Sequence, residues 1–304
     1  MTCNRKFSRA EILKGWLELT RLPNLFTVPG DILAGASMAL FIKKEIPFIL
    51  PAIVISLSLY ISGLMLNDFF DRKTDCLERP DRPIPSGRIS HNTTLISGIS
   101  FILIALTLSS IYKKVFWISL CLIFLILFYN GFARKIPLLG IIVMGLCRGM
   151  NLLLGAFICS SPINNMVLTG AIGETLYIAS VTNLACHETK DHPVGIKVWF
   201  PLISLLIIFP ILVLISNSSK FGIFMCFIAM CWIFFIQLQI RKKMKKLSKS
   251  IGDLIRALVL IQCALIALSM EKNPVNRHYY LIGIIILFLF FIISDLSAKK
   301  FYGS

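Results

Sequence analysis

Charged residues are scarce in this sequence. Only 15% of the 304 residues are Asp, Glu, Lys or Arg, whereas soluble domains carry about 25%. Apolar residues make up 57% of the chain, and the mean hydropathy is +0.82. This composition excludes an ordinary soluble protein of this length. We expect a single membrane-embedded domain that spans residues 1–304.

The cysteines lack the spacing of a metal site or of a disulfide framework. The nine cysteines form no CxxC pair, and most of them lie in apolar runs, where cysteine behaves as a small hydrophobic residue. No linker, low-complexity tract or second domain interrupts the chain. Because the N-terminal arm is polar, we expect no cleavable signal peptide there, and instead an interfacial helix within residues 1–24.

Long apolar runs predict an all-α fold. A hydrocarbon core about 30 Å thick is crossed by a helix of about 17–25 apolar residues. Pro29, Gly30 and Asp31 interrupt the first such run, and Arg256 and Gln262 lie in the ninth. The sequence therefore predicts a polytopic bundle of nine or ten transmembrane helices. The runs lie near residues 25–42, 47–66, 93–112, 115–133, 136–159, 166–186, 198–216, 221–239, 254–270 and 279–297.

Basic residues follow an alternating pattern along the chain. Most of the 31 lysines and arginines fall in every second loop, and therefore on one side of the membrane. Since such loops face the cytoplasm, we expect loops 67–92, 183–197 and 241–250 to be cytoplasmic in a protein of the plasma membrane. The net charge of +16 then indicates attraction to anionic membrane lipids. It does not indicate nucleic-acid binding, because the basic residues are scattered between spans.

Oxygen-bearing side chains recur at helical spacing after the second apolar run. Asn67, Asp71 and Asp75 are four residues apart. With about 100° between successive residues of a helix, these three share one face, and Asp68 lies at its edge. The alternative interpretation of any single acid here is a solvated polar cap at the end of a span.

The same spacing returns farther along the chain in Asn183, His187 and Asp191. An even number of predicted spans separates this triplet from the first, so both emerge on the cytoplasmic side. Hard oxygen ligands suit Mg²⁺, which is usually held by one or two carboxylates together with substrate phosphates. His187 is a poorer Mg²⁺ ligand and suits a hydrogen bond or a softer metal. The two triplets, interleaved with Arg and Lys, indicate a diphosphate bound through Mg²⁺.

The segment NDFFDRKTDCLERPDRPIPSGRIS, residues 67–90, resembles the first aspartate-rich motif of the UbiA superfamily of intramembrane prenyltransferases. The sequence departs from that family at His187, where most members carry Asp. The resemblance covers most of the chain. Further segments that resemble the family are TRLPNLFTVPGDILAG (20–35), FYNGFARKIPLLG (128–140), CRGMNLLLGA (147–156) and DHPVGIK (191–197).

The resemblance implies a helix bundle whose cavity opens to lipid and binds a polyprenyl diphosphate. Mg²⁺ held by both motifs would draw off diphosphate, and an aromatic or lipid-like acceptor would attack the allylic cation. It implies catalytic roles for Asp71, Asp75 and Asp191. The metal ligands that it implies are Asn67, Asp71, Asp75, Asn183 and Asp191. The substrate contacts that it implies are Asn24, Arg72, Tyr129, Lys135, Arg148 and Lys197. Candidates without an assigned role are Asp68, His187 and Glu188.

Arg148 lies inside the fifth apolar run, three residues before Asn151. A charge at the centre of a membrane costs about 2.5–3.5 kcal/mol on insertion scales, so this arginine needs a compensating role. It either clamps neighbouring helices through hydrogen bonds or faces the substrate in a cavity, and we expect the second.

A different class of function stays open from the sequence. The chain could be a membrane transport or scaffold protein that keeps the fold without turnover, which His187 favours. The intact triplet of Asn67, Asp71 and Asp75 favours the enzyme, because a retired site has no need of clustered acids.

Overall fold

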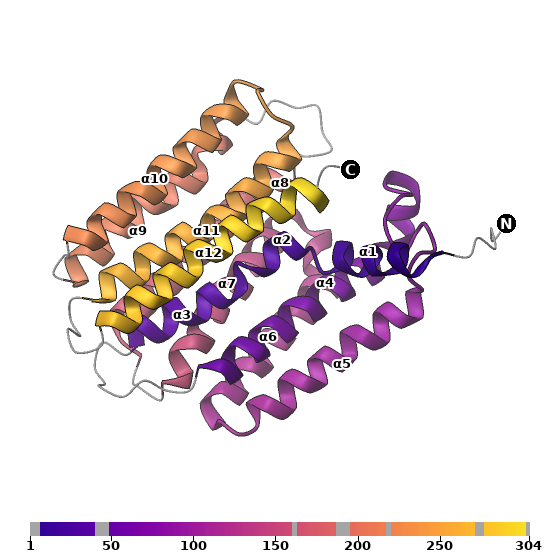
Figure 1. The fold of residues 1–304 in the computed structure, drawn as a ribbon, viewed down its shortest axis with the longest axis horizontal. Coiled ribbons are helices and arrows are strands. Elements are labelled where there is room, and N and C mark those ends of the chain that lie inside the picture. Colours follow the sequence, from indigo (N-terminus) through magenta and orange to yellow (C-terminus); the bar gives the residue numbers. More distant parts are fainter. Residues whose placement is uncertain are drawn as a thin grey trace.

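The computed structural model describes residues 7–39, 49–159, 163–186, 195–216, 220–270 and 277–301. Within these ranges the regular structure is helical, which confirms the predicted all-α fold. Figure 1 shows the long helices running side by side, with α1 at one end of the bundle. The α-helices are α1 (Arg9–Leu19), α2 (Leu22–Leu25), α3 (Val28–Ala39), α4 (Leu50–Glu78), α5 (His91–Ser109), α6 (Lys113–Gly131), α7 (Pro137–Ile158), α8 (Asn165–Ala185), α9 (Phe200–Ser216), α10 (Lys220–Arg241), α11 (Leu247–Met270) and α12 (Arg277–Phe301). Two 3₁₀ turns, η1 (Ala133–Lys135) and η2 (Gly195–Trp199), precede α7 and α9.

Helices α3 to α12 correspond to the predicted apolar runs. Eight of the described helices are long and apolar enough to cross a membrane by length and composition. The other two are α3, which has 12 described residues, and α8, which carries Glu174. Helix α3 is buried along nearly its whole length, and Glu174 is buried as well. These two helices face protein more than lipid, so they tolerate polar residues that an outer helix would not.

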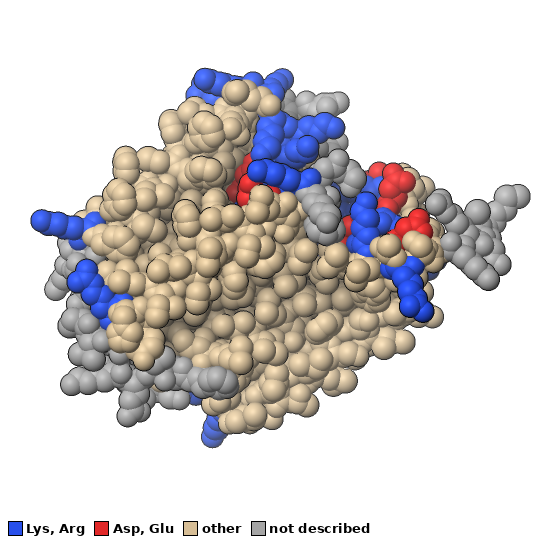
Figure 2. Space-filling view, viewed as in Figure 1, with Lys and Arg blue, Asp and Glu red and all other residues tan. Residues whose placement is uncertain are grey.

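The outer surface of the bundle is apolar. Large hydrophobic side chains on α5, α9, α10 and α12 are exposed, whereas α11 is buried along most of its length. Figure 2 shows a broad face without charge, with Lys and Arg side chains gathered toward its edges. A surface of this kind is stable in contact with hydrocarbon. The protein is a multi-pass integral membrane protein.

Helix α4 continues past its apolar part. The predicted cytoplasmic loop 67–92 begins as helix, because residues 67–78 contain no glycine or proline and α4 ends only at Glu78. Arg79 precedes Pro80 and has left the helical conformation, as expected for a residue before proline. The first acid motif therefore lies on the last turns of a helix. The predicted loop 183–197 also begins as helix, since α8 runs to Ala185.

Glycines let α3 and α7 pack closely. A Cβ on Gly35 would lie 2.0 Å from the carbonyl oxygen of Leu152, and a Cβ on Gly155 would lie 2.4 Å from that of Ile32. Only glycine permits this approach of two backbones, a packing mode typical of membrane helices. The approach brings the polar side chains of α7 against those of α3.

Candidate functional site

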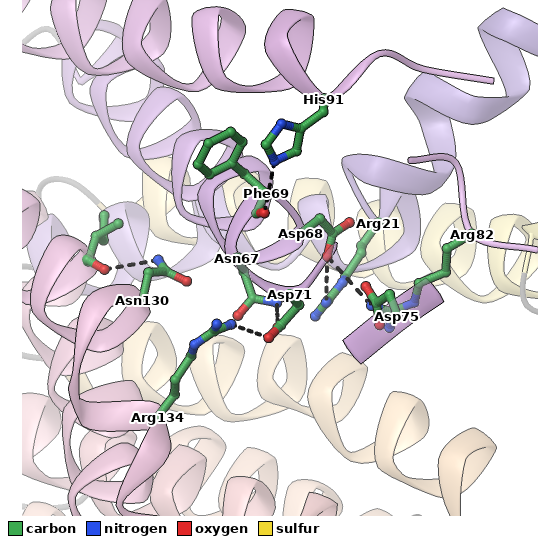
Figure 3. A network of polar contacts seen from close by, with 11 residues as sticks. Arg21, Asn67, Asp68, Phe69, Asp71, Asp75, Arg82, His91, Asn130 and Arg134 are labelled. Atoms are coloured by element: carbon green, nitrogen blue, oxygen red, sulfur yellow. Dashed lines mark hydrogen bonds and ion pairs between the residues drawn. The ribbon is translucent and has the colours of Figure 1, made fainter. Parts of the chain in front are cut away.

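The first acid motif forms one face of α4 at its C-terminal end. Asn67 Nδ2 donates a hydrogen bond to Asp71 Oδ2 at 3.1 Å, as expected for side chains four residues apart on a helix. Asp68 and Asp75 are buried, and Asp71 is partly exposed. Figure 3 shows Asn67, Asp68, Asp71 and Asp75 projecting from the same helix end. The predicted common face of Asn67, Asp71 and Asp75 is present, with Asp68 beside it.

Three arginines from three other segments contact this acid face. Arg134, in the η1 turn after α6, forms an ion pair with Asp71. Arg82 Nη1 lies 2.7 Å from Asp75 Oδ2 and 3.7 Å from Asp68 Oδ1. Arg21, between α1 and α2, contacts Asp68. All these contacts are drawn in Figure 3. Each carboxylate of the motif thus has a guanidinium partner, which offsets the repulsion among the three acids.

Arg21 is the third of these arginines, and its backbone is unusual. It lies between α1 and α2 with φ of 45°, in the left-handed region that few non-glycine residues adopt. Its Nη2 lies 3.7 Å from Asp68 Oδ1. Strained backbone of this kind costs about 1–3 kcal/mol and often marks a functional position. The sharp turn between α1 and α2 is what brings this guanidinium back to the acid face.

The loop after α4 is held in place by α1. Arg88 Nη2 lies 2.7 Å from Glu18 Oε2 and donates a hydrogen bond of 2.6 Å to the carbonyl oxygen of Asp81. Leu19 of α1 forms a small hydrophobic cluster with Ile84 and Ile89 of the loop. These contacts fix the path of the loop, and so they fix Arg82 next to the acids. Helix α1 of the predicted N-terminal arm therefore packs against the loop that carries Arg82.

Tyr129 lies near the end of α6, close to the acid face. Asp71, Arg21 and Arg134 are near enough to its phenol for their charges to act on it. Cys186, which follows the last residue of α8, is in the same neighbourhood. The tyrosine is therefore near both the acid face and the end of α8.

The second motif is described only in part. Asn183 is half-buried near the end of α8. His187, Glu188 and Asp191 lie outside the described residues, so their predicted roles stay predictions. Because Tyr129 is near both Asp71 and Cys186, the start of the second motif lies at the same end of the bundle as the first.

The other predicted substrate contacts fall in different places. Arg72 and Lys135 are exposed, and within the described part of the chain neither forms an ion pair with the acids, whereas their neighbours Asp71 and Arg134 contact each other. Lys197 is half-buried in the η2 turn. Asn24 is buried in α2, three residues after Arg21. The sequence did not single out Arg21, Arg82 or Arg134, although all three lie within segments that carry the family resemblance.

Arg148 lies in a buried polar cluster between α3 and α7. Its Nε lies 2.9 Å from Asp31 Oδ2, and its Nη2 donates a hydrogen bond of 2.5 Å to Thr27 Oγ1. Asn151 Nδ2 and Gln262 Nε2 also donate to the Asp31 carboxylate, at 2.6 and 2.5 Å. The guanidinium lies 5.9 Å from the ring centroid of Tyr60. Through these contacts Arg148 forms an interhelical clamp, one of the two roles considered for it from the sequence. The predicted contact of Arg148 with a substrate stays a prediction.

The acid face has the donor chemistry of a magnesium site without forming a complete ligand cage. Among the described residues, no three carboxylate, imidazole or thiol groups are grouped so that they could hold one metal ion. Mg²⁺ does not need such a cage, because it keeps several waters and is often bound by one or two carboxylates plus phosphate oxygens. The oxygens of Asn67, Asp71 and Asp75 fit that requirement.

The comparisons with known proteins agree on one family. The sequence profile of the UbiA prenyltransferase family matches residues 31–251. The digeranylgeranylglyceryl phosphate synthase of Methanothrix thermoacetophila is 31% identical over 146 residues, which are 47% of this chain and 53% of that protein. This chain spans about half the length of the curated relatives it matches.

Solved structures share the fold. A UbiA homolog from Aeropyrum pernix K1 superposes with a TM-score of 0.65 at 14% identity, covering 80% of this chain and 96% of that chain. A UbiA homolog from Archaeoglobus fulgidus, bound to DMAPP and Mg²⁺, gives a TM-score of 0.51 at 15% identity and covers 86% of this chain and 99% of that chain. At these identities the likeness concerns the fold alone.

Proposed function

Because this chain belongs to the UbiA prenyltransferase family, we propose that it transfers a polyprenyl group from a polyprenyl diphosphate to an acceptor in the membrane. The observation that carries the proposal is the acid face of α4 surrounded by Arg21, Arg82 and Arg134. A magnesium diphosphate needs carboxylates for the metal and cations for the phosphate oxygens. Both sets are in place at one end of the bundle.

The mutual pairing of acids and arginines suggests how the site takes its ligand. The diphosphate would draw the guanidinium groups of Arg82 and Arg134 away from Asp75 and Asp71, since guanidinium matches phosphate geometry through paired hydrogen bonds. The freed carboxylates, with the amide oxygen of Asn67, would hold Mg²⁺. When bound, Mg²⁺ would stabilise the negative charge that develops on the leaving diphosphate.

The protein's own side chains then have distinct roles. Arg82 and Arg134 would hold the diphosphate oxygens as the bond to the prenyl carbon breaks. Tyr129, which lies near Asp71 and the arginines, would donate a hydrogen bond from its hydroxyl to the same oxygens. Asp191 and Asn183 would hold a second metal from the end of α8. The contact made by Arg21 would keep α2 closed over the reacting group and exclude water.

The names of the curated relatives favour one class of acceptor. They are synthases of digeranylgeranylglyceryl phosphate, so a lipid-like acceptor that bears a phosphate ester is favoured over an aromatic one. Such an acceptor needs basic side chains near the diphosphate site, and Arg72, Lys135 and Lys197 are suitable. The acid face would lie at the cytoplasmic surface of the plasma membrane. The charged diphosphate group of a membrane-bound polyprenyl substrate would lie at the same surface.

The proposal is tested with the purified protein in lipid nanodiscs. A panel of polyprenyl diphosphates of different chain length is incubated with a glycerol phosphate lipid precursor or a hydroxybenzoate, and products are identified by mass spectrometry. We expect release of diphosphate together with a prenylated phosphate-bearing lipid. Binding of the prenyl diphosphate without any product from any acceptor would favour the transport or scaffold alternative.

A further inference from the structure

We infer that the start of α11, the end of α12 and the loop that follows α10 form a separate binding site for the phosphate headgroup of an anionic membrane lipid. A hollow of about 280 Å³ opens there, on residues that the family motifs do not include. Figure 2 shows Lys and Arg side chains around a small acidic patch in this region. The residues that line the hollow are Lys245, Ser248, Lys249, Gly252, Asp253, Arg256, Asp295, Ala298 and Lys299.

The charges of the hollow favour an anion. Four cations face two carboxylates, Asp253 and Asp295, so the lining keeps an excess of two positive charges. Arg256 is nearly buried, with 8% of its side chain exposed, and it forms an ion pair with Asp253. Its Nη2 lies 4.0 Å from Asp295 Oδ1, and Lys299 Nζ lies 3.1 Å from Asp295 Oδ2. This network holds the guanidinium in one position, ready for a further anionic partner.

Lys249 supplies a positive charge that is not part of this ion-pair network. It lines the hollow from the first turn of α11 and is exposed, and it has no ion-pair partner within the described parts of the chain. Lys245 and Lys249 belong to the run RKKMKKLSK, residues 241–249, whose other basic residues add positive charge close by. Basic pockets between helices at a membrane surface are typical sites for anionic lipid headgroups.

An adjoining hollow with aromatic side chains along one part indicates a lipid rather than a free phosphate. A second space of about 200 Å³ shares Lys245, Asp253, Arg256 and Asp295 with the first. It continues along Trp232, Phe235 and Phe291, of which Trp232 and Phe235 are 43% and 53% exposed on the outer face of the bundle. With 1.5 Å of rise per residue, Trp232 lies roughly 13 Å below the end of α10. Acyl chains would lie along these rings while the phosphate occupies the basic hollow.

The test measures lipid binding to the full-length protein in detergent by native mass spectrometry, with phosphatidylglycerol and phosphatidylcholine as probes. Lys249→Gln removes the unpaired cation without breaking an internal ion pair. We expect it to weaken phosphatidylglycerol binding about fivefold, the factor that corresponds to about 1 kcal/mol per basic residue near an anionic surface. Lys246→Gln is the matched control, since Lys246 lies in the same basic run but does not line the hollow. The affinity of the Lys246→Gln variant for phosphatidylglycerol should stay close to that of the wild type.

Two further measurements distinguish a lipid headgroup from free phosphate as the ligand of the hollow. Phe235→Ala should weaken binding of phosphatidylglycerol. Inorganic phosphate or glycerol 3-phosphate, at the same concentration as the lipid, should not displace it. Equal binding of phosphatidylcholine and phosphatidylglycerol, or equal losses for Lys249→Gln and Lys246→Gln, would overturn the inference. So would displacement of the lipid by inorganic phosphate at equal concentration, which would identify a site for the free ion.

Discussion

Arg82 Nη1 lies 2.7 Å from Asp75 Oδ2, across the turn that ends α4. The pair is repeated one helical turn earlier, where Arg134 contacts Asp71. The carboxylates proposed for the metal and the cations proposed for the diphosphate are therefore each other's partners. Removing an acid and removing an arginine should therefore have different effects.

Removing an acid should affect the chemical step. Asp71→Ala and Asp75→Ala each delete a carboxylate from the acid face, and we expect kcat to fall by about 10²–10³, the scale of losing one strong electrostatic contact in a transition state. Asp81→Ala is the control, because Asp81 is an exposed acid in the loop that follows. Steady-state kinetics of diphosphate release gives the comparison. Equal rates for all three variants and the wild type would remove the acid face from the mechanism.

Removing an arginine should affect substrate binding first. Hydrogen bonds to charged groups contribute about 1.5–3 kcal/mol, so Arg82→Ala should raise the KM for the polyprenyl diphosphate about tenfold or more. Arg72→Ala should change it far less, because Arg72 is exposed and has no ion pair with the acids in the described structure. The ratio of the two KM values measures which arginine contacts the diphosphate. A larger effect of Arg72→Ala would contradict the assignment.

The second motif can be tested although it lies outside the described residues. Asp191→Ala should lower the rate as strongly as Asp75→Ala, because His187 already replaces a carboxylate. If His187 is a weak ligand, His187→Asp should keep or raise the rate and the affinity for Mg²⁺. If it is a base or recognises the acceptor, the same change should suppress turnover while diphosphate binding persists. Titration of Mg²⁺ against initial rate distinguishes these outcomes.

Arg148 should act on stability. Its removal leaves the buried Asp31 carboxylate without its cation, and breaking a buried pair in this way costs about 3–5 kcal/mol. Arg148→Met should therefore lower the melting temperature in detergent, and the double change with Asp31→Asn should recover most of the loss. A variant Arg148→Lys with an unchanged melting temperature and a raised KM would instead support contact with the substrate.

Much of the fold could be predicted because membrane helices appear in a sequence as long apolar runs. The ten runs correspond to α3–α12, and the spacing of Asn67, Asp71 and Asp75 predicted their common face. The apolar run ends at Leu66, whereas α4 continues through the charged motif to Glu78. Nothing between Asn67 and Glu78 breaks a helix, and only Pro80 does so.

The arginine partners could not be predicted because they depend on turns. Arg134 and Lys135 are neighbours, and the η1 turn decides that Arg134 faces Asp71. Likewise, Arg21 reaches Asp68 only through its left-handed backbone. The pairing of Asp31 with Arg148 did have a signal in the sequence, since two opposite charges inside separate apolar runs are expected to meet.

Metal dependence tests the central claim most directly. Purified protein in nanodiscs is supplied with a polyprenyl diphosphate and a phosphate-bearing lipid acceptor, and diphosphate release is followed with Mg²⁺, with excess EDTA, and with Mg²⁺ restored. We expect turnover with Mg²⁺, its loss in EDTA and its full return when the ion is added back. Undiminished turnover in excess EDTA would contradict the account.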